Sequence, residues 1–532
     1  MTSPPSSEAG LESTRGKWMA LTAALLGWMF DGLEMGLFPL VARPALQELL
    51  GPALQELSDL ERESLVGLWY ANATAGFLIG AATGGVLFGW LGDRLGRVRA
   101  MMLSVLTYAL FSGACGFAGQ AWQVVALRFV AALGMGGEWS LGVALVMEIW
   151  PDRSRAFLAG LIGAAANLGY FLIGALGRGL GMILDDIRGW LLAMHLSEEA
   201  VAWLLSNSGW RLLMIVAAAP ALLTFFIRIF VPESRRWQHE QGRGTTSSWA
   251  GQDLLGVGVG AAGAIAMIPL WALDDVPLAV RLGGSLVALL IATAGYTYPV
   301  LRFLQRARAA VPASPGLYRG VIKRMLLGAC LGGVALLGTW ASLQWAPVWA
   351  DKIAEVREAK ADTQMASAAG AILGTLLGAM LGDWIGRRLA YTLLCLGSLV
   401  SALAFYQSNT TYTGQFLATV FVAGGLTASF YGWLPLYLPE LFPTAVRATG
   451  QGFSFNFGRI IAAVGVLQTA NLMGLFDAKR AADRPAFLQN ILNLFQNQSG
   501  YPAACSVMSF IYVLGLVLIW LAPETRAKPL PE

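Results

Sequence analysis

Charged residues are scarce in this chain. Asp, Glu, Lys and Arg together make up 13% of its 532 residues, whereas a soluble domain typically carries about 25%. Hydrophobic residues make up 56%, and the mean hydropathy is +0.60. A soluble chain of this length would need far more polar surface to cover its core. The composition therefore excludes a soluble enzyme, a disordered chain and a nucleic-acid binder, and the net charge of +4 is too small to indicate a polyanionic partner.

Residues that support redox, metal or cofactor chemistry are also few. The sequence has no G-x-x-x-x-G-K-[ST] loop, and its one G-x-G-x-x-G, at 258–263, lies in an apolar run without strand–turn–helix context. We therefore expect no nucleotide and no other cofactor. His195 and His239 fall outside every predicted membrane span, so any intramembrane proton carrier must be a carboxylate. We expect no disulfides but small apolar packing roles for the four cysteines, which stand singly in apolar stretches: Cys115, Cys330, Cys395 and Cys505.

Long apolar runs take the place of polar surface. A helix needs about 20 apolar residues to cross a bilayer. Windows of that length predict fourteen spans, at 18–40, 64–90, 99–117, 121–149, 157–178, 210–230, 253–273, 278–301, 324–347, 364–381, 389–407, 412–437, 448–473 and 501–522. The first span contains Asp31 and Glu34 and is followed by no cleavage-like site, so we interpret it as a retained span.

The two middle runs, 253–273 and 278–301, are separated by Asp274, Asp275 and Pro277. This short break predicts a tight hairpin of two spanning helices. The alternative is a pair of interfacial or re-entrant helices. An inserted pair of spans leaves the orientation of the following spans unchanged.

Basic residues indicate the orientation of the chain. With fourteen spans, all of the basic clusters lie on one side of the membrane, which predicts a multi-pass cell-membrane protein with both termini in the cytoplasm. These clusters lie at 15–17, 94–99, 153–155, 235–243, 302–324, 387–388, 447 and 526–528.

Two motifs occur twice at one offset. GWLGDRLGRVR at 89–99 is matched by AMLGDWIGRR at 379–388, and Asp93 and Asp383 are about 290 residues apart. Glu148 precedes an arginine by seven positions in MEIWPDRSR, as Glu440 does in PELFPTAVR, again at an offset of about 290. Two motif pairs at one offset indicate two homologous halves. The predicted organisation is a tail at 1–17, a six-helix half at 18–230, a central segment with the extra pair at 231–323, a second six-helix half at 324–522 and a tail at 523–532.

These motifs resemble the major facilitator superfamily. The resemblance rests on GDRLGR at 92–97, its weaker copy at 382–387, and RFVAALGMGG at 128–137. VPESRRW at 231–237 and APETRAK at 522–528 are similar to the signatures that close each half of sugar porters. DGLE at 31–34, GMGGEWSLG at 134–142 and the run 438–463 look closest to proton-coupled carriers of sialic acid, aromatic acids and other carboxylates. The resemblance implies an all-α major facilitator fold with fourteen transmembrane helices, and a transporter rather than an enzyme.

The resemblance also implies a gate of opposite charges at the cytoplasmic helix ends, where glycines such as Gly92 and Gly96 permit a tight loop. Trp384 replaces the first basic residue of the second copy, so we expect that copy to be weaker. The alternative is that the arginines only direct membrane topology. The candidate gating residues are Asp93, Arg97, Glu148, Arg155, Asp383, Arg387, Glu440 and Arg447.

Charged residues at membrane depth are functional candidates. Asp31 lies about 13 Å from the outer end of the first span and Arg128 about 10 Å from the outer end of the fourth, so the two can pair if these spans adjoin. Separation of such a pair would let the carboxylate bind a proton. The alternative is a permanent structural ion pair. The candidates for proton coupling are Asp31, Glu34, Arg128 and Glu138.

A carboxylate substrate needs a buried cation, and an arginine can bind it through two parallel hydrogen bonds. Arg459 and Arg128 are the candidates, with a structural contact as the alternative role for Arg459. The other candidate substrate-binding residues are Asn167, Gln344, Trp345 and Asn456. Trp69, Tyr70 and Asn72 begin the second span, where we interpret the aromatic residues as interfacial anchors.

The sequence thus predicts a monomeric proton-coupled symporter of a small organic anion, such as a sialic, aromatic or other carboxylic acid, working in the lipid bilayer. A sugar symporter or facilitator is the first alternative, because of the 231–237 and 522–528 signatures. A drug:proton antiporter is the second, although 157–177 lacks the G-x-x-x-G-P-x-x-G-G motif that such antiporters usually carry. A membrane sensor would need a sizeable soluble domain, and no predicted loop is long enough.

Overall fold

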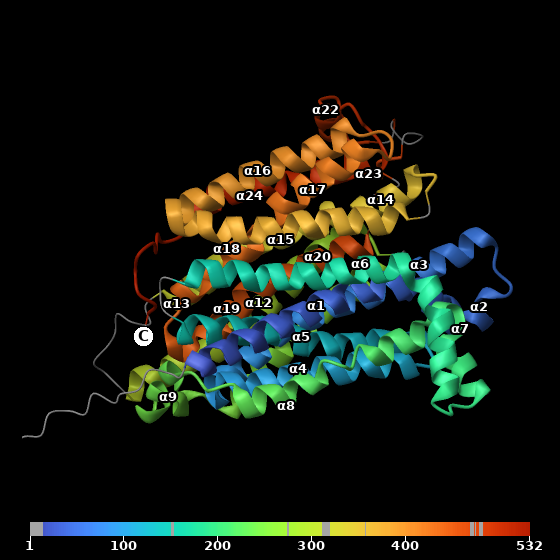
Figure 1. Cartoon of the computed structure of the whole chain (residues 1–532). Helices are drawn as coiled ribbons and strands as arrows, with labels where there is room; N and C mark the ends of the chain where they lie inside the picture. The colour runs from blue at the N-terminus through green and yellow to red at the C-terminus, as the bar shows by residue number, and fades with distance from the viewer. Residues whose placement is uncertain are drawn as a thin grey trace, which may run out of the picture.

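The computed structural model describes residues 14–150, 154–273, 276–310, 320–356, 358–468, several positions between 473 and 482, and 484–531. Every regular element in this described part is a helix. The long helices run side by side, so the molecule has two ends (Figure 1). One end, at the left of Figure 1, carries α9 (Arg235–Gly242) and the mark for the C-terminus; the other carries α2 (Gly51–Leu54) and α22 (Ala486–Leu492).

Helices of the first half cover its six predicted spans, the sixth of which, 210–230, is divided between the end of α7 and α8. They are α1 (Thr14–Leu49), α3 (Asp59–Leu95), α4 (Arg97–Ala114), α5 (Ala121–Ile149), α6 (Arg155–Ala193), α7 (Glu198–Val216) and α8 (Ala221–Phe230). The start of α3 shows why helices begin where they do. Ser58 accepts a hydrogen bond from the backbone N–H of Glu61, and the Glu61 carboxylate accepts one from the Ser58 N–H at 2.9 Å, so two otherwise unpaired donors are satisfied.

The second half repeats this plan with more interruptions. It contains α13 (Val321–Trp340), α14 (Ala346–Ile353), α15 (Ala359–Ile385), α16 (Arg387–Ser408), α17 (Gly414–Ala428), α18 (Phe430–Tyr437), α19 (Arg447–Asn456), α20 (Gly458–Leu467), α23 (Gly500–Ser509) and α24 (Ile511–Leu518). Among the described residues, 13 helical stretches are long and apolar enough to span a membrane. The predicted span at 448–473 is not one of them. It is divided at Phe457 into α19 and α20, and residues 469–472 lie outside the described part.

Glycines in α3 permit its close packing on α5. A Cβ atom at Gly80 would lie 2.4 Å from the Phe129 carbonyl oxygen, and one at Gly84 would lie 1.9 Å from that of Leu133. The two backbones therefore approach more closely than any larger residue would permit.

The central segment forms the hairpin that the sequence predicts, although Asp274 and Asp275 at its turn lie outside the described residues. It consists of α10 (Leu254–Ile265), α11 (Met267–Ala272) and α12 (Leu278–Ala310). The Tyr296 hydroxyl lies 2.7 Å from the hydroxyl of Thr83 on α3, and Gln468 donates to the Trp271 carbonyl at 2.7 Å. The hairpin therefore contacts both halves.

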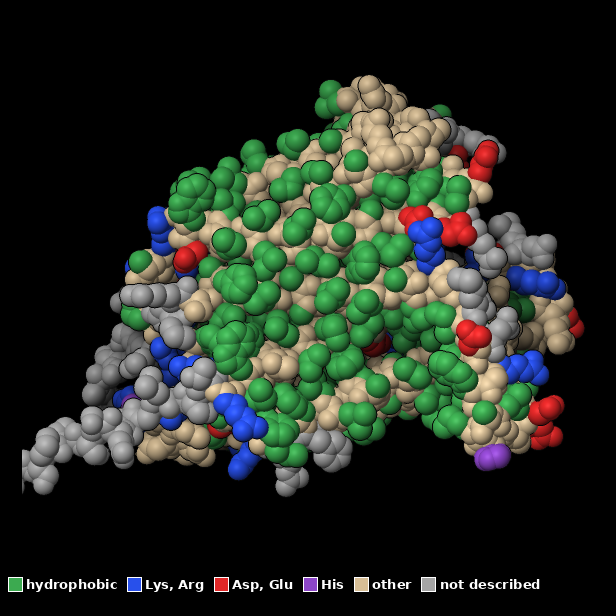
Figure 2. All heavy atoms as spheres, viewed as in Figure 1, with side chains coloured by type: hydrophobic (Ala, Val, Ile, Leu, Met, Phe, Trp, Pro, Cys, Tyr) green, Lys and Arg blue, Asp and Glu red, His purple; other side chains and the backbone are tan. Residues whose placement is uncertain are grey.

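The surface agrees with a membrane location. Apolar side chains cover the middle of the face seen in Figure 2, Lys and Arg gather towards its left end, and acidic and basic side chains mix at its right end. The four cysteines are free. Cys330 is exposed rather than packed, contrary to the expected packing role.

Replacement of Gly84 by Ala tests the close packing of α3 on α5. We expect Gly84→Ala to lower the stability of the purified protein by about 1–3 kcal/mol because the added methyl group must push the two backbones apart. Thermal unfolding in detergent measures the effect. Gly258→Ala is the matched control, since a Cβ atom at Gly258 meets nothing within 4 Å. Equal melting temperatures for the two variants would contradict the packing argument.

Candidate functional site

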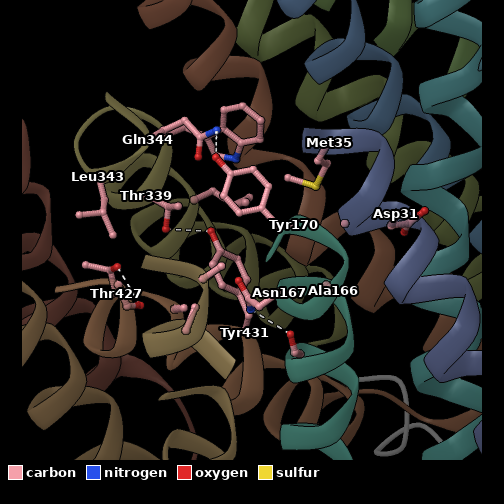
Figure 3. A pocket seen from close by; sticks show the side chains of 18 of the residues that line it. Asp31, Met35, Ala166, Asn167, Tyr170, Thr339, Leu343, Gln344, Thr427 and Tyr431 are labelled. Carbon is pink, nitrogen blue, oxygen red and sulfur yellow. Dashed lines mark hydrogen bonds between the residues drawn. The ribbon is translucent and has the colours of Figure 1, made fainter. Parts of the chain in front are cut away.

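A central cavity of about 140 Å³ lies between the two halves. Figure 3 shows side chains from both halves meeting there, with Asp31 on α1 on the opposite side from Gln344 and Leu343. Most of the wall is aromatic or apolar. The residues that line it include Trp28, Asp31, Trp139, Asn167, Tyr170, Thr339, Trp340, Gln344, Tyr431, Phe455 and Arg459.

Arg459 supplies the cation of this cavity. Its side chain is 7% exposed, and neither Nε nor Nη1 has a hydrogen-bond partner. The guanidinium carbon lies 5.7 Å from the centre of the Phe455 ring, and the nearby groups that act on it electrostatically are Tyr431 and Asp31. An arginine with unpaired buried donors that lines a cavity is suited to bind an anionic group.

Hydrogen bonds hold several polar side chains of the cavity in place. The Tyr431 hydroxyl donates to Thr339 at 2.9 Å, and Gln344 Nε2 donates to the Tyr170 hydroxyl at 3.3 Å (Figure 3). Asn167 Nδ2 donates to the Gly163 carbonyl at 2.9 Å. These bonds fix the positions of the side chains before any ligand enters.

A stacked aromatic pair closes part of the wall. The rings of Trp139 on α5 and Phe455 on α19 are nearly parallel, with centroids 3.8 Å apart. The two residues come from different halves, so the stack also marks the seam between the halves.

The predicted pair of Asp31 and Arg128 is wrong for this structure: Glu34 occupies the position opposite Arg128. Arg128 Nη1 lies 2.8 Å from Glu34 Oε1, and the guanidinium carbon lies 3.7 Å from the centre of the Phe38 ring. Glu34 lies about 4.5 Å farther along α1 than Asp31, because three residues separate them. That shift brings Glu34 level with Arg128 and leaves Asp31 facing the central cavity.

Glu138 is a third buried carboxylate. It is completely buried, and neither of its oxygens has a hydrogen-bond partner. Its side chain fills a notch at Gly27 on α1, where a Cβ atom would lie 1.6 Å from Glu138 Oε1. The Tyr108 hydroxyl is also buried without a partner. Sequence reasoning did not single out Tyr108, which is an ordinary aromatic residue within an apolar run.

The predicted substrate-binding residues lie in three different places. Asn167, Gln344 and Arg459 line the central cavity, whereas Arg128 and Trp345 line a second, larger cavity towards the α2 end. Asn456 lines neither. Its Nδ2 donates to the carbonyls of Gly136 and Gly452, both at 3.1 Å, so its contacts are those of a helix-packing residue.

The repeated loop motif of the first half forms a buried charge cluster at the α9 end. Arg97 lies 2.7 Å from Asp93 and 3.1 Å from Glu148, and all three side chains have no exposed surface. Arg97 Nη2 also donates to the Thr444 carbonyl of the other half at 2.7 Å. We call this cluster, with its partners on α19, the latch.

The latch joins the two halves directly. Asp93 accepts hydrogen bonds from the backbone N–H of Ala448 at 3.2 Å and of Thr449 at 2.9 Å, and from the Thr449 hydroxyl at 2.6 Å. Arg447 Nη1 lies 2.7 Å from Glu148. Separation of the halves at this end would therefore break several charge-assisted hydrogen bonds at once.

The second copy makes its contacts mostly within its own half. Arg387 lies 2.7 Å from Glu440 but 3.5 Å from Asp383, whose side chain is 58% exposed. Trp384, at the position of the missing basic residue, is 74% exposed. Arg155 is buried and acts electrostatically on Glu440. The structure thus shows two unequal copies.

The glutamates of the VPESRRW and APETRAK segments bind helix N-termini. Glu233 accepts from the first two backbone N–H groups of α4 at 2.9 and 3.1 Å, and Glu524 does the same for α16 at 3.0 and 3.1 Å. Burial raises the pKa of Glu233. Burial also acts on Glu524, but hydrogen bonds from backbone N–H groups outweigh it and lower the pKa of that carboxyl.

The segment after the second of these glutamates covers the latch. The Pro531 carbonyl accepts a hydrogen bond from Arg447 Nη2 at 2.5 Å, and Leu530 is buried in the main core. Sequence reasoning treated this segment as a tail because it is short and polar.

Asp93→Asn tests whether the latch stabilises the closed end. We expect it to lower the stability of the purified protein by about 1–3 kcal/mol, because it removes one of the two carboxylates that pair with the buried Arg97 and weakens the hydrogen bonds that Asp93 accepts from α19. Asp383→Asn is the matched control at the equivalent position of the second copy, where we expect a change within about 0.5 kcal/mol. Thermal unfolding of the two variants measures both losses of stability. Equal losses would contradict the asymmetry of the two copies.

Three relatives are similar over most of their length. A Haemophilus influenzae protein named for metabolite transport is 25% identical over 96% of this chain and 98% of its own length. A probable 4-methylmuconolactone transporter of Cupriavidus pinatubonensis is 25% identical over 85% of each chain. The cis,cis-muconate transport protein of Acinetobacter baylyi is 25% identical over 75% of this chain and 78% of its own.

The fold is similar to that of solved transporter structures. The proton:xylose symporter XylE, from Escherichia coli, superposes with a TM-score of 0.63 at 19% identity, over 97% of this chain and 98% of XylE. A family model of the Major Facilitator Superfamily matches residues 23–466. With two helical halves that meet at a central cavity, this chain therefore belongs to the Major Facilitator Superfamily and is a membrane transporter, not an enzyme.

Proposed function

We propose that this transporter is a proton-coupled symporter of a small organic anion that carries a carboxylate. The observation that carries the proposal is Arg459, a buried arginine at the wall of the central cavity with two unpaired donors on Nε and Nη1. The fork that an arginine presents to a carboxylate pairs Nη2 with either Nε or Nη1, so each of the two unpaired donors can form one arm of a bidentate contact with a carboxylate that enters the cavity.

The walls of the cavity favour a compact, largely planar acid. Trp28, Trp139, Tyr170, Tyr431 and Phe455 contribute ring surfaces, and the volume is only about 140 Å³. The relatives named for cis,cis-muconate and 4-methylmuconolactone support this class of substrate. A polyhydroxylated sialic acid would fit less well, because most of its hydroxyl groups would face apolar side chains.

Asp31 is placed to couple the anion to a proton. It lines the same cavity, Arg459 is among the charged groups that act on it, and its Oδ1 has no hydrogen-bond partner. A substrate carboxylate that binds Arg459 withdraws a favourable positive charge from Asp31, which then takes up a proton more readily. Anion and proton would bind together, so a monocarboxylate would cross the membrane without net charge and a dicarboxylate with one negative charge.

Glu34 and Glu138 complete the proposed coupling group. Glu34 holds Arg128 in an ion pair, and Glu138 is buried beside α1 with unpaired oxygens. A carboxylate without a partner at this depth is stable only when it is protonated or solvated. In this proposal Glu138 holds a proton, and the Glu34–Arg128 ion pair keeps α1 and α5 in place beside the cavity.

The latch would be the cytoplasmic gate. Basic residues gather at that end, which supports a cytoplasmic location for both termini, and we further propose that the protein acts as a monomer in the cell membrane. The cavities lead from the other end towards Arg459, so the structure would represent an outward-facing state. Breaking of the latch contacts, including those of Arg97 and Arg447, would give access from the cytoplasm.

A sugar symporter is the second candidate, and Asn167 and Gln344 in the cavity favour it because amides bind hydroxyl groups. The drug:proton antiporter remains less well supported by the sequence.

Substitution of Arg459 tests the substrate class. We expect Arg459→Gln to reduce uptake of cis,cis-muconate into proteoliposomes by at least about 100-fold, because a charge-assisted bond of 1.5–3 kcal/mol is lost at each of two donors. Arg459→Lys keeps the charge but loses the fork, so it should recover only part of the activity. Uptake of carboxylates by Arg459→Gln at the wild-type rate would contradict the proposal, and thermal stabilisation by neutral sugars alone would favour the second candidate.

Substitution of Asp31 tests the energy coupling. Asp31→Asn should abolish accumulation driven by a pH gradient but leave exchange of labelled for unlabelled anion, because the variant binds the anion without a proton. Asp383→Asn is the control, since Asp383 lies at the α9 end away from the cavity. Undiminished uphill uptake by Asp31→Asn in proteoliposomes would refute this role.

A further inference from the structure

A second cavity of about 300 Å³ lies beyond the central one, towards the α2 end. We call it the vestibule. It is lined by parts of both halves, and its side chains include Phe38, Arg43, Glu63, Tyr70, Phe77, Arg128, Tyr170, Trp340, Gln344, Trp345, Lys360 and Gln364. Tyr70, interpreted from the sequence as an interfacial anchor, is therefore part of a cavity wall.

The vestibule lies between the surface and the central cavity. Arg43 and Glu63 pair at 2.5 Å with both side chains more than half exposed, and they also line a surface recess of about 560 Å³. At its inner side, Tyr170, Trp340 and Gln344 line both the vestibule and the central cavity. A ligand that moves from the recess to Arg459 would pass through the vestibule.

The wall shared by the two cavities is held by hydrogen bonds between the halves. Gln344 donates to the Tyr170 hydroxyl at 3.3 Å, and Gln364 donates to the Tyr170 carbonyl at 3.0 Å. Figure 3 shows the Tyr170 ring beside Gln344. A ligand in the vestibule is thus separated from the central cavity until these side chains move.

The vestibule carries cations suited to an organic anion. Arg128 is 3% exposed and is fixed between Glu34 and the rings of Phe38 and Phe77, yet its Nε has no hydrogen-bond partner. Lys360, which is exposed at the wall, has no ion pair with any described residue. The one acid at the mouth, Glu63, is already paired with Arg43.

We propose that the vestibule is a second, weaker site for the same carboxylate substrate, which captures the anion before it reaches Arg459. This inference rests on the proposed function. Lys360 would attract the anion by its unpaired charge, Arg128 Nε would offer a buried donor, and Tyr70, Tyr170 and Trp345 would contact the apolar body. Transfer to the central cavity would follow when the Tyr170–Gln344 wall opens.

Removal of the Lys360 charge tests the capture step. In proteoliposomes at low ionic strength, we expect Lys360→Gln to raise KM for cis,cis-muconate by about threefold or more with kcat unchanged, and the difference to vanish at high salt. Lys352→Gln is the matched control: Lys352 is also exposed at this end but lies over the Tyr501 ring and outside the vestibule. Equal KM values for both variants at low salt would overturn the capture role.

Counting of bound anions separates the vestibule from the central site. Equilibrium dialysis of the purified protein with labelled cis,cis-muconate should show one tighter and one weaker site. Arg459→Gln should keep only the weaker site, and adding Lys360→Gln should weaken that remaining site by about threefold or more at low ionic strength. A single site in the wild type that disappears in Arg459→Gln overturns the vestibule and leaves the proposed function standing. A tighter site that survives Arg459→Gln, or no binding to the wild type, overturns the proposed function and this inference with it.

Discussion

The chemistry of the central cavity depends on one buried arginine, which lies where the two halves meet. Arg459 lies in a wall that is mostly aromatic, and Nε and Nη1 have no partner. A charge in such a place is costly unless something anionic comes to it. Asp31 acts on it electrostatically from the other side of the cavity, so an acidic and a basic side chain lie across the seam between the halves.

The two halves carry the same motifs in sequence but differ in structure. The difference lies in which copy of the loop motif bonds across the seam. The first copy of the loop motif is buried and bonded across the seam through Asp93, whereas Asp383 of the second copy is mostly exposed. If the latch is the gate, as we propose, its contacts across the seam would form and break together. At the other end of the molecule, the hydrogen bond from Gln344 to Tyr170 joins the two halves at the vestibule wall.

The sequence predicted most of the spans and the central hairpin because apolar length is a local signal. Its charged motifs singled out residues that the structure brings together in the latch, and their role as a gate is our proposal. The sequence misplaced the partner of Arg128, since Asp31 and Glu34 share a helix face and only the exact offset between α1 and α5 decides between them. It placed Asn456 at a binding site although its amide is used in helix packing. Tyr108, Lys360 and Leu530 gave no signal, because their roles come from neighbours distant in the chain.

The central claim is that anion and proton bind together at one cavity. Titration calorimetry of the purified protein with cis,cis-muconate, repeated in buffers of different ionisation enthalpy, measures how many protons the protein takes up with each anion. The account predicts net uptake approaching one proton per anion bound at Arg459, and none in Asp31→Asn. Binding of the anion to the wild type with no proton uptake at any pH between 5 and 8 would contradict it.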